Sequence, residues 1–236
     1  MYRFDTHFNT TPSPEYFENY FEKLSKNGAI GVSVGECESL IQGAKLFEQK
    51  GNTVSWIRLQ KDGTLNLEDI KNQNFQYLFV SPYMMDTFLK IPKEQIQKIF
   101  DGEIISQGYL EEKIDKDFET VKKIFLETLQ NYFGDQLYFF VDNNNTLPFT
   151  LHFALKNMRA REIIRTLRFH NIFLVNGERC AIGIEKPSRI LEEMGYPLEI
   201  ARNALSLSFT QNYQEDEIEK IVMLIYNKHK QLLMLQ

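Results

Sequence analysis

The stretch that decides the fold runs from Asn171 to Leu191 and reads NIFLVNGERCAIGIEKPSRIL. Its first part, at 172–175, is an apolar run typical of a short buried strand. A polar loop that carries Cys180 follows. Pro187 then predicts the start of a helix, because proline is favoured in the first helical turn. A thiol on a loop between a strand and a helix is a position where sulfur chemistry can take place.

The composition is that of a folded protein without a nucleic-acid or membrane signature. Of the 236 residues, 43% are hydrophobic and 25% are charged, which is enough apolar content for one large or two modest domains. The net charge of -5 and the lack of a basic stripe in the sequence argue against a nucleic-acid partner. No apolar run is long enough to cross a bilayer, and the N-terminal residues do not resemble a secretory signal. We therefore expect a cytoplasmic protein with reduced cysteines.

The region before about residue 102 alternates strands with helices. The apolar patterns predict strands at 29–34, 53–59 and 77–81, a helix over 37–50 and a short helix near 67–71. This order is typical of a parallel sheet flanked by helices. We therefore predict a small α/β domain over residues 1–102, with three or four strands in its sheet.

The pattern changes in residues 103–236. Helices are predicted at 117–133, 158–169 and 187–194 and from about 214 onward, and strands at 137–141, 148–155, 172–175 and 204–209. Helix, two strands, helix, strand, helix, strand, helix is the order of an α+β domain. We expect its strands to be mostly antiparallel.

The order of several short motifs resembles that of the cysteine desulfurases, which belong to the class V aminotransferase group and use pyridoxal phosphate (PLP). The matching positions in the 171–191 stretch are Ile172, Gly177, Cys180, Gly183, Pro187, Ser188 and Leu191. Met194-Gly195 and Ala201-Arg202 continue the match, and residues 63–70 (GTLNLEDI) resemble a family turn and helix. The resemblance implies a PLP-transferase-like α/β fold, with a reduced large α/β domain and an α+β small domain.

The resemblance also implies catalytic groups that this chain lacks. The family's Schiff-base lysine and its pyridinium aspartate would fall between Phe79 and Gly102, and its phosphate-binding turn between Leu24 and Gly28, but none of these three motifs is present. Cys37 stands where the family has a ring-stacking histidine, and Ser206 stands where it has the arginine that holds the substrate carboxylate. We therefore expect no PLP and no conventional PLP catalysis. The leading hypothesis is a pseudoenzyme that acts through protein contacts, on a genuine desulfurase or a sulfur-acceptor protein.

Two other functions stay open. In the family, the cysteine at the position of Cys180 carries the persulfide sulfur, so this chain could be a sulfur or redox carrier without any cofactor. Arg179 and Lys186 would favour the thiolate of Cys180, although an inherited thiol without a present role is the simpler interpretation. The third hypothesis is a heteromer in which a second chain supplies the lysine. A homodimer is the other assembly that stays open, because members of the family form dimers.

The remaining candidates favour structural roles. Cys37 is expected to begin its helix, where the neighbouring carboxylates of Glu36 and Glu38 disfavour its thiolate. The histidines have no metal-ligand spacing with one another or with the cysteines, so no metal site is predicted. They are His7, His152, His170 and His229. Of these, His7 lies in a stretch that resembles the family's cofactor-facing loop, whereas His152 and His229 are expected to be packed or half-exposed rather than catalytic.

Overall fold

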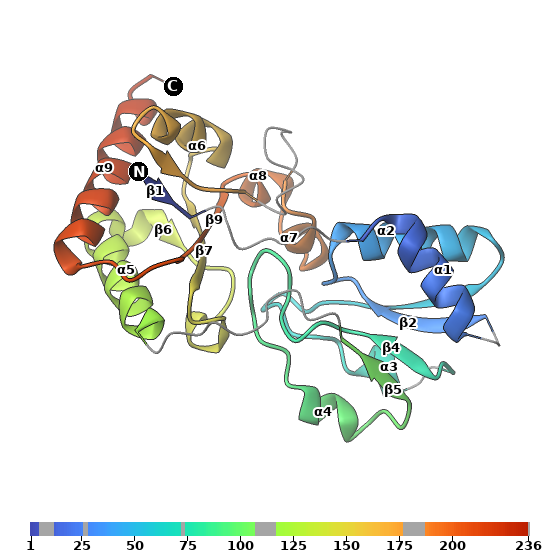
Figure 1. The fold of residues 1–236 in the computed structure, drawn as a ribbon. Helices are drawn as coiled ribbons and strands as arrows, with labels where there is room; N and C mark the ends of the chain where they lie inside the picture. The colour runs from blue at the N-terminus through green and yellow to red at the C-terminus, as the bar shows by residue number, and fades with distance from the viewer. Residues whose placement is uncertain (5–11, 26–27, 72–73, 107–116, 177–186, 236) are drawn as a thin grey trace.

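The computed structural model describes residues 1–4, 12–25, 28–71, 74–106, 117–176 and 187–235. Figure 1 shows two lobes, one built around strands β2–β5 and the other around β6, β7 and β9, with α7 and α8 between them. Among the described residues, no helix combines the length and apolar character that a bilayer span requires.

The first lobe contains the predicted parallel sheet. Its strands are β2 (Ala29–Ser33), β3 (Thr53–Ile57), β4 (Tyr77–Phe79) and β5 (Glu103–Ile105). They are all parallel and lie in the order β3-β2-β4-β5, with Gly31 opposite both Ser55 and Leu78. The strands at 29–34, 53–59 and 77–81 are therefore confirmed. The edge strand β5 was not predicted, because its three residues are too few to show a period.

Helices cover the sheet of the first lobe. They are α1 (Pro14–Leu24), α2 (Glu38–Gln49), α3 (Glu68–Lys71) and α4 (Lys93–Gln97). The pair α1 and α2 lies close together at Gly43, where a Cβ atom would come within 2.6 Å of the Pro14 carbonyl oxygen. Phe17 and Phe21 of α1 are fully buried against the sheet. The predicted helix at 37–50 is confirmed, whereas α1 was not predicted.

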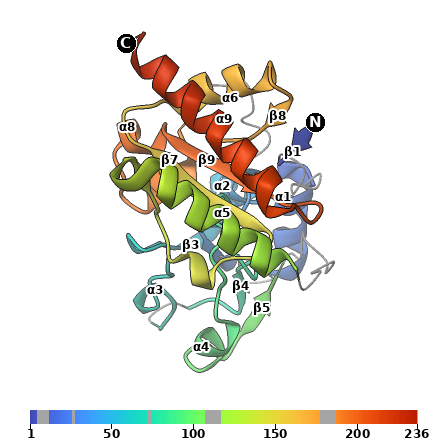
Figure 2. The same cartoon turned by 90° about the vertical axis from the view of Figure 1, so that its left-hand side faces the viewer.

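The second lobe has the predicted α+β organisation. Its sheet consists of β6 (Leu137–Tyr138), β7 (Thr150–Leu155) and β9 (Ala204–Ser208), all antiparallel in the order β6-β7-β9. Its helices are α5 (Phe118–Phe133), α6 (Ala160–Arg168), α7 (Arg189–Glu193), α8 (Leu198–Ala201) and α9 (Glu215–Leu233), and 3-10 turns lie at Gly134–Gln136 and Asn143–Asn145. The long helices α5 and α9 run side by side over one face of the sheet (Figure 2).

Both faces of this sheet are buried. Leu151 and Phe153 alternate with Thr150 and His152 along β7, and all four side chains are buried. Leu151 and Phe153 belong to the apolar cluster of α5 and α9, so Thr150 and His152 point to the opposite face. Ala154 lies on that opposite face and belongs to the cluster of the first lobe. The sheet of the second lobe therefore packs a partly polar face against the first lobe.

The beginning of the chain lies with the second lobe. Strand β1 (Tyr2–Arg3) pairs in parallel with β8 (Ile172–Phe173). Phe4 is fully buried against Phe125 and Phe209, with ring centroids 5.8 and 6.4 Å away. The division of the chain at residue 102 stays a prediction, and these contacts add that the first four residues pack on the second lobe.

Candidate functional site

The candidate site lies at the carboxyl edge of the parallel sheet, where open α/β sheets bind their ligands. Glu36 follows β2 and Ser81 follows β4 at this edge. The Glu36 carboxylate is 2% exposed, and it accepts hydrogen bonds from the backbone N–H of Ser81 and, at 2.6 Å, from its hydroxyl. A buried carboxylate therefore ties the two strand ends together.

The segment after Ser81 turns back on itself beside this edge. The Met84 N–H donates to the Leu89 carbonyl at 2.8 Å, and Asp86 and Phe88 both have a positive φ, at 59° and 58°. All four of these side chains are buried. The Met84 sulfur lies so close to Gly35 that a Cβ atom there would be 1.9 Å away. The space above the end of β2 is thus filled by a side chain.

The second lobe contacts this edge through the start of α7. The Ser188 hydroxyl donates to the Asp86 carboxylate at 2.5 Å. The guanidinium of Arg189 donates to the carbonyl oxygens of Val34, at 2.5 Å, and of Glu36, while its Nε lies 2.9 Å from a Glu38 carboxylate oxygen. The Arg189 Nε–H is not aligned for a hydrogen bond, so the contact with Glu38 is an ion pair. We call these contacts of Ser188 and Arg189 the interlobe latch.

A buried histidine lies next to the interlobe latch. His152 of β7 stands opposite Ser206 of β9, and the Ser206 hydroxyl lies 3.5 Å from the Asp86 carbonyl oxygen. The His152 ring packs against Phe140 with centroids 5.1 Å apart, and among the described residues no group bonds to either ring nitrogen. Burial lowers the pKa of His152 to about 3, so the ring is neutral at physiological pH. Of the two environments expected for His152, packed or half-exposed, the structure shows the packed one.

The other predicted candidates in the described chain also have structural environments. Cys37 is 2% exposed and occupies the N-cap position of α2, as predicted. His229 is fully buried against Phe133, and this burial lowers its pKa. His170 is exposed in the turn after α6. No group of three metal-ligating side chains occurs within the described ranges.

Cys180 lies outside the described residues, as do Arg179, Lys186 and His7, so their roles stay predictions. The described ends of the segment that carries Cys180 are both held at the junction. On one side, the backbones of Val175 and Ser206 exchange hydrogen bonds of 3.2 and 2.8 Å. On the other side, Ser188 is bound to Asp86. The described residues on both sides of this segment therefore take part in contacts at the junction.

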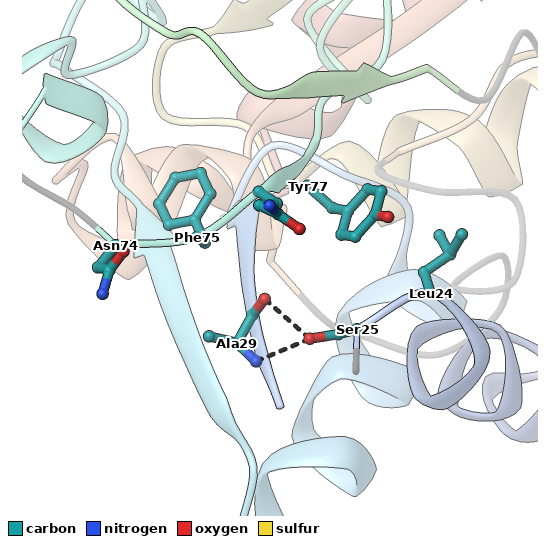
Figure 3. A pocket seen from close by; sticks show the side chains of 7 residues that line it. Leu24, Ser25, Ala29, Asn74, Phe75 and Tyr77 are labelled. Carbon is teal, nitrogen blue, oxygen red and sulfur yellow. Dashed lines mark hydrogen bonds between the residues drawn. The ribbon is translucent and has the colours of Figure 1, made fainter. Parts of the chain in front are cut away.

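A cavity of about 540 Å³ lies at the opposite edge of the sheet. Figure 3 shows its lining, which includes Ala29 at the start of β2 and Tyr77 at the start of β4. Ser25 lies in the turn where the family resemblance placed a phosphate-binding motif. Its hydroxyl is engaged locally, accepting from the Ala29 N–H at 2.8 Å and donating to the Ala29 carbonyl at 3.0 Å. Because this turn enters the amino end of β2, it lies away from the edge where ligands bind.

Comparisons with solved structures show which known fold the two lobes share. The NifS-like protein of Rickettsia africae superposes with a TM-score of 0.71 at 13% identity, over 93% of this chain and 81% of its own. For a cysteine desulfurase from Thermococcus onnurineus the TM-score is 0.68 at 11% identity, over 92% and 78%. The chain has the fold of the NifS-like cysteine desulfurases. The predicted PLP-transferase-like fold is therefore confirmed, and a further NifS-like protein supports it with a TM-score of 0.69 at 14% identity, over 89% and 77%.

The sequence comparison agrees with this desulfurase fold over a shorter stretch. A cysteine desulfurase of Azospirillum brasilense is 28% identical over 88 residues, which are 36% of this chain and 22% of that relative. No family model matches the chain. The relationship to the cysteine desulfurases predicted from the sequence is thus supported.

The expectation that the chain binds no PLP stays a prediction. The cofactor needs a lysine amine, a carboxylate at its ring nitrogen and donors for its phosphate. Lys122 is the one buried lysine within the described ranges, and it donates to the Thr146 hydroxyl and, at 3.0 Å, to the Leu147 carbonyl. At the junction, Arg189 already binds backbone carbonyls, and the neighbouring carboxylates of Glu36 and Asp86 would repel a phosphate.

Two residues of the interlobe latch were not predicted from the sequence. Ser188 was noted as a matching position, but neither its partner Asp86 nor the contacts of Arg189 were predicted. An arginine in the first turn of a helix that starts with Pro187-Ser188 is a weak signal, because the helix dipole disfavours a cation there. The sequence could therefore have predicted that this arginine contacts carbonyl or carboxylate oxygens. It could not have predicted which residues supply them.

Proposed function

We propose that this chain is a desulfurase-fold protein that works without PLP and acts through contacts with a sulfur-transfer partner. The single observation that carries the proposal is the closed junction between the lobes. Glu36 and Ser81 bind each other there, Met84 fills the space beside Gly35, and Arg189 joins the second lobe to the end of β2. Side chains of both lobes therefore meet at the place where a ring and its phosphate would have to bind.

The sequence supports the same function. The lysine and aspartate motifs of the family are missing between Phe79 and Gly102. A protein that keeps the fold and lacks these groups retains surfaces for recognition and loses covalent capture of the cofactor. The proposed partner is a genuine desulfurase or a sulfur-acceptor protein, and the proposed location is the cytoplasm.

The experiment that tests this proposal is reconstitution with PLP. The purified protein is incubated with excess PLP, treated with borohydride and digested, and its peptides are searched by mass spectrometry for a phosphopyridoxyl-lysine. An authentic cysteine desulfurase serves as the positive control. We expect no single modified lysine at a stoichiometry comparable to the control. One lysine that is modified stoichiometrically, with an absorption band that disappears when this lysine is replaced by alanine, contradicts the proposal.

A second function, sulfur carriage by Cys180, is favoured by the contacts of the described residues on either side of its segment. Both described ends of this segment are held at the interlobe junction, through Val175 and Ser188. In the proposed step, the Cys180 thiolate attacks the terminal sulfur of a partner's persulfide. The Cys180–sulfur bond forms as the partner's sulfur–sulfur bond breaks, and the partner leaves as a thiolate. The exchange is balanced and needs no external oxidant.

Sulfur loading tests the carrier function directly. The protein is incubated with an active desulfurase and cysteine, and its mass is measured for the gain of one sulfur atom. Cys180→Ser removes the proposed acceptor, and Cys37→Ser is the matched control because Cys37 is buried. We expect sulfur uptake by the wild type and by Cys37→Ser only. Equal uptake by Cys180→Ser shows that the thiol of Cys180 is not the carrier.

A further inference from the structure

Helix α6 presents a stripe of arginines on the outer side of the second lobe. Its apolar residues Ala160, Ile163, Ile164 and Leu167 are buried. On the other side, Arg161, Arg165 and Arg168 follow one another at spacings of four and three residues, which places them along one line of a helix surface. Seven residues of helix rise correspond to about 10 Å. We call these three residues and Phe169 the α6 surface.

The charge of this surface is opposite to that of the protein. The segment from Lys156 to Phe169 carries five cations and one carboxylate, Glu162, in a chain with a net charge of -5. Arg165 and Arg168 are exposed, and neither forms a hydrogen bond or an ion pair with the described residues. The expectation that the chain has no basic stripe is therefore wrong. The three arginines are separated in the sequence, and only helical geometry aligns them.

An exposed aromatic side chain lies at the end of this stripe. Phe169 follows directly after α6, and 88% of its side chain is exposed, the largest exposed fraction among the described large hydrophobic residues. A large apolar side chain beside arginines is a combination that protein interfaces use, because aromatic residues and arginine supply most hot spots. In Figure 1, α6 lies at the top of the second lobe, away from α1 and α2 of the first lobe.

We propose that the α6 surface docks an acidic segment of a partner protein, with carboxylates on Arg165 and Arg168 and an apolar side chain on Phe169. This inference rests on the proposed function, to which it adds the chemistry of the partner. Guanidinium groups bind carboxylates in a bidentate manner. The negative charge of the remaining chain disfavours a long polyanion such as nucleic acid, which would extend beyond the stripe. A short acidic segment fits the length of the stripe.

The test uses a fluorescent synthetic peptide and the full chain. The peptide is an amphipathic helix with glutamates at spacings of four and three residues and leucines on its other face, and binding is followed by anisotropy. Arg165→Glu with Arg168→Glu reverses two charges of the α6 surface. Lys93→Glu with Lys98→Glu is the matched control, because both lysines are exposed around α4 in the first lobe and the net charge changes equally.

We expect the Arg165/Arg168 reversal to weaken binding by at least about tenfold and the Lys93/Lys98 reversal by no more than about twofold. Binding of the wild type should weaken with salt, since exposed charges are screened. Phe169→Ala should weaken binding without changing the salt dependence. Arg165→Gln with Arg168→Gln removes the charges without reversing them. This variant should also lose peptide binding, as the Arg165/Arg168 reversal does, while its thermal unfolding stays that of the wild type.

Three results overturn the inference. The first is equal weakening by the two charge reversals, which reports net charge alone. The second is tighter binding of a duplex oligonucleotide than of the peptide, together with loss of the oligonucleotide binding in the Arg165/Arg168 variant. This result would make the surface a nucleic-acid site. The third is the absence of peptide binding by the folded wild type at low salt. None of these results depends on PLP, so failure here is distinguishable from failure of the reconstitution experiment.

Discussion

The Ser188 hydroxyl lies 2.5 Å from a carboxylate oxygen of Asp86, and this hydrogen bond joins positions 102 residues apart across the two lobes. The same hydroxyl caps α7, because it accepts the Leu191 N–H at 3.3 Å. Asp86 is 1% exposed and has a φ of 59°, a left-handed conformation that aspartate tolerates better than most residues. One serine therefore stabilises both a helix start and a buried carboxylate.

Replacing Ser188 by alanine should lower the free energy of unfolding by about 2–3 kcal/mol, because it removes a helix cap and the hydrogen-bond partner of a buried carboxyl group. Ser13→Ala is the control: Ser13 caps α1 by accepting the Tyr16 N–H at 3.3 Å and is exposed. Loss of this cap alone should cost about 1 kcal/mol. Urea unfolding of both variants measures the difference, and equal losses would mean that the Asp86 contact contributes nothing.

Arg189→Lys should also destabilise the protein, although it keeps the charge. A lysine cannot reach the carbonyls of Val34 and Glu36 with the planar fork of a guanidinium, and we expect a loss of about 1–3 kcal/mol. The matched control is Arg58→Lys, since Arg58 forms a two-point contact with Asp69 at 2.9 and 2.6 Å on the surface.

The exposed pair of Arg58 should contribute less than about 1 kcal/mol. Chemical unfolding gives both values, and hydrogen exchange at residues 34–36 reports whether the latch has opened. A loss for Arg189→Lys no larger than that for Arg58→Lys contradicts the role of the latch.

The buried His152 should make the protein sensitive to acid. The pKa of His152 is about 3 in the folded state, whereas that of an unfolded histidine is about 6.5. Between these values the unfolded chain binds a proton that the folded chain does not, so the stability is complete above about pH 6.5 and falls as the pH is lowered toward about 3. The loss attributable to this group should reach about 2 kcal/mol at about pH 5.

The substitution His152→Leu removes the titrating group and should reduce this loss on acidification. His170→Leu, at a histidine exposed to solvent in the turn after α6, should leave the pH dependence as in the wild type. Urea unfolding at about pH 7.5 and about pH 5 provides the comparison. If the wild type and His152→Leu lose the same stability on acidification, another group causes the acid sensitivity.

Cys37 should be unreactive in the native protein. It is 2% exposed at the start of α2, and thiol reagents need an accessible thiolate. In a Cys180→Ser background, a chromogenic disulfide reagent should detect no fast thiol before denaturant is added and one thiol afterwards. Rapid reaction of the native variant would show that the start of α2 opens, and the structural interpretation of Cys37 would then be wrong.

Local patterns explain most of the elements that were predicted correctly. The helix at Phe118–Phe133 shows an apolar stripe, and the strands at Ala29–Ser33 and Thr150–Leu155 are apolar runs bounded by polar turns. Short elements such as β1 and β5 were missed because two or three residues carry no period. Their positions depend on pairing with β8 and β4, which are distant in the sequence.

The sequence by itself determined the family of the fold, because periodicity and motif order depend on neighbouring residues along the chain. It also predicted that catalytic groups of that family are missing, and this stays a prediction. Only the tertiary structure decided what occupies the junction between the lobes. The contacts of Asp86 with Ser188 and of Arg189 with Val34 cross more than one hundred positions, and no local pattern specifies such partners. Burial then decided the charge state of His152, since the cost of charging a group depends on the surroundings that folding creates.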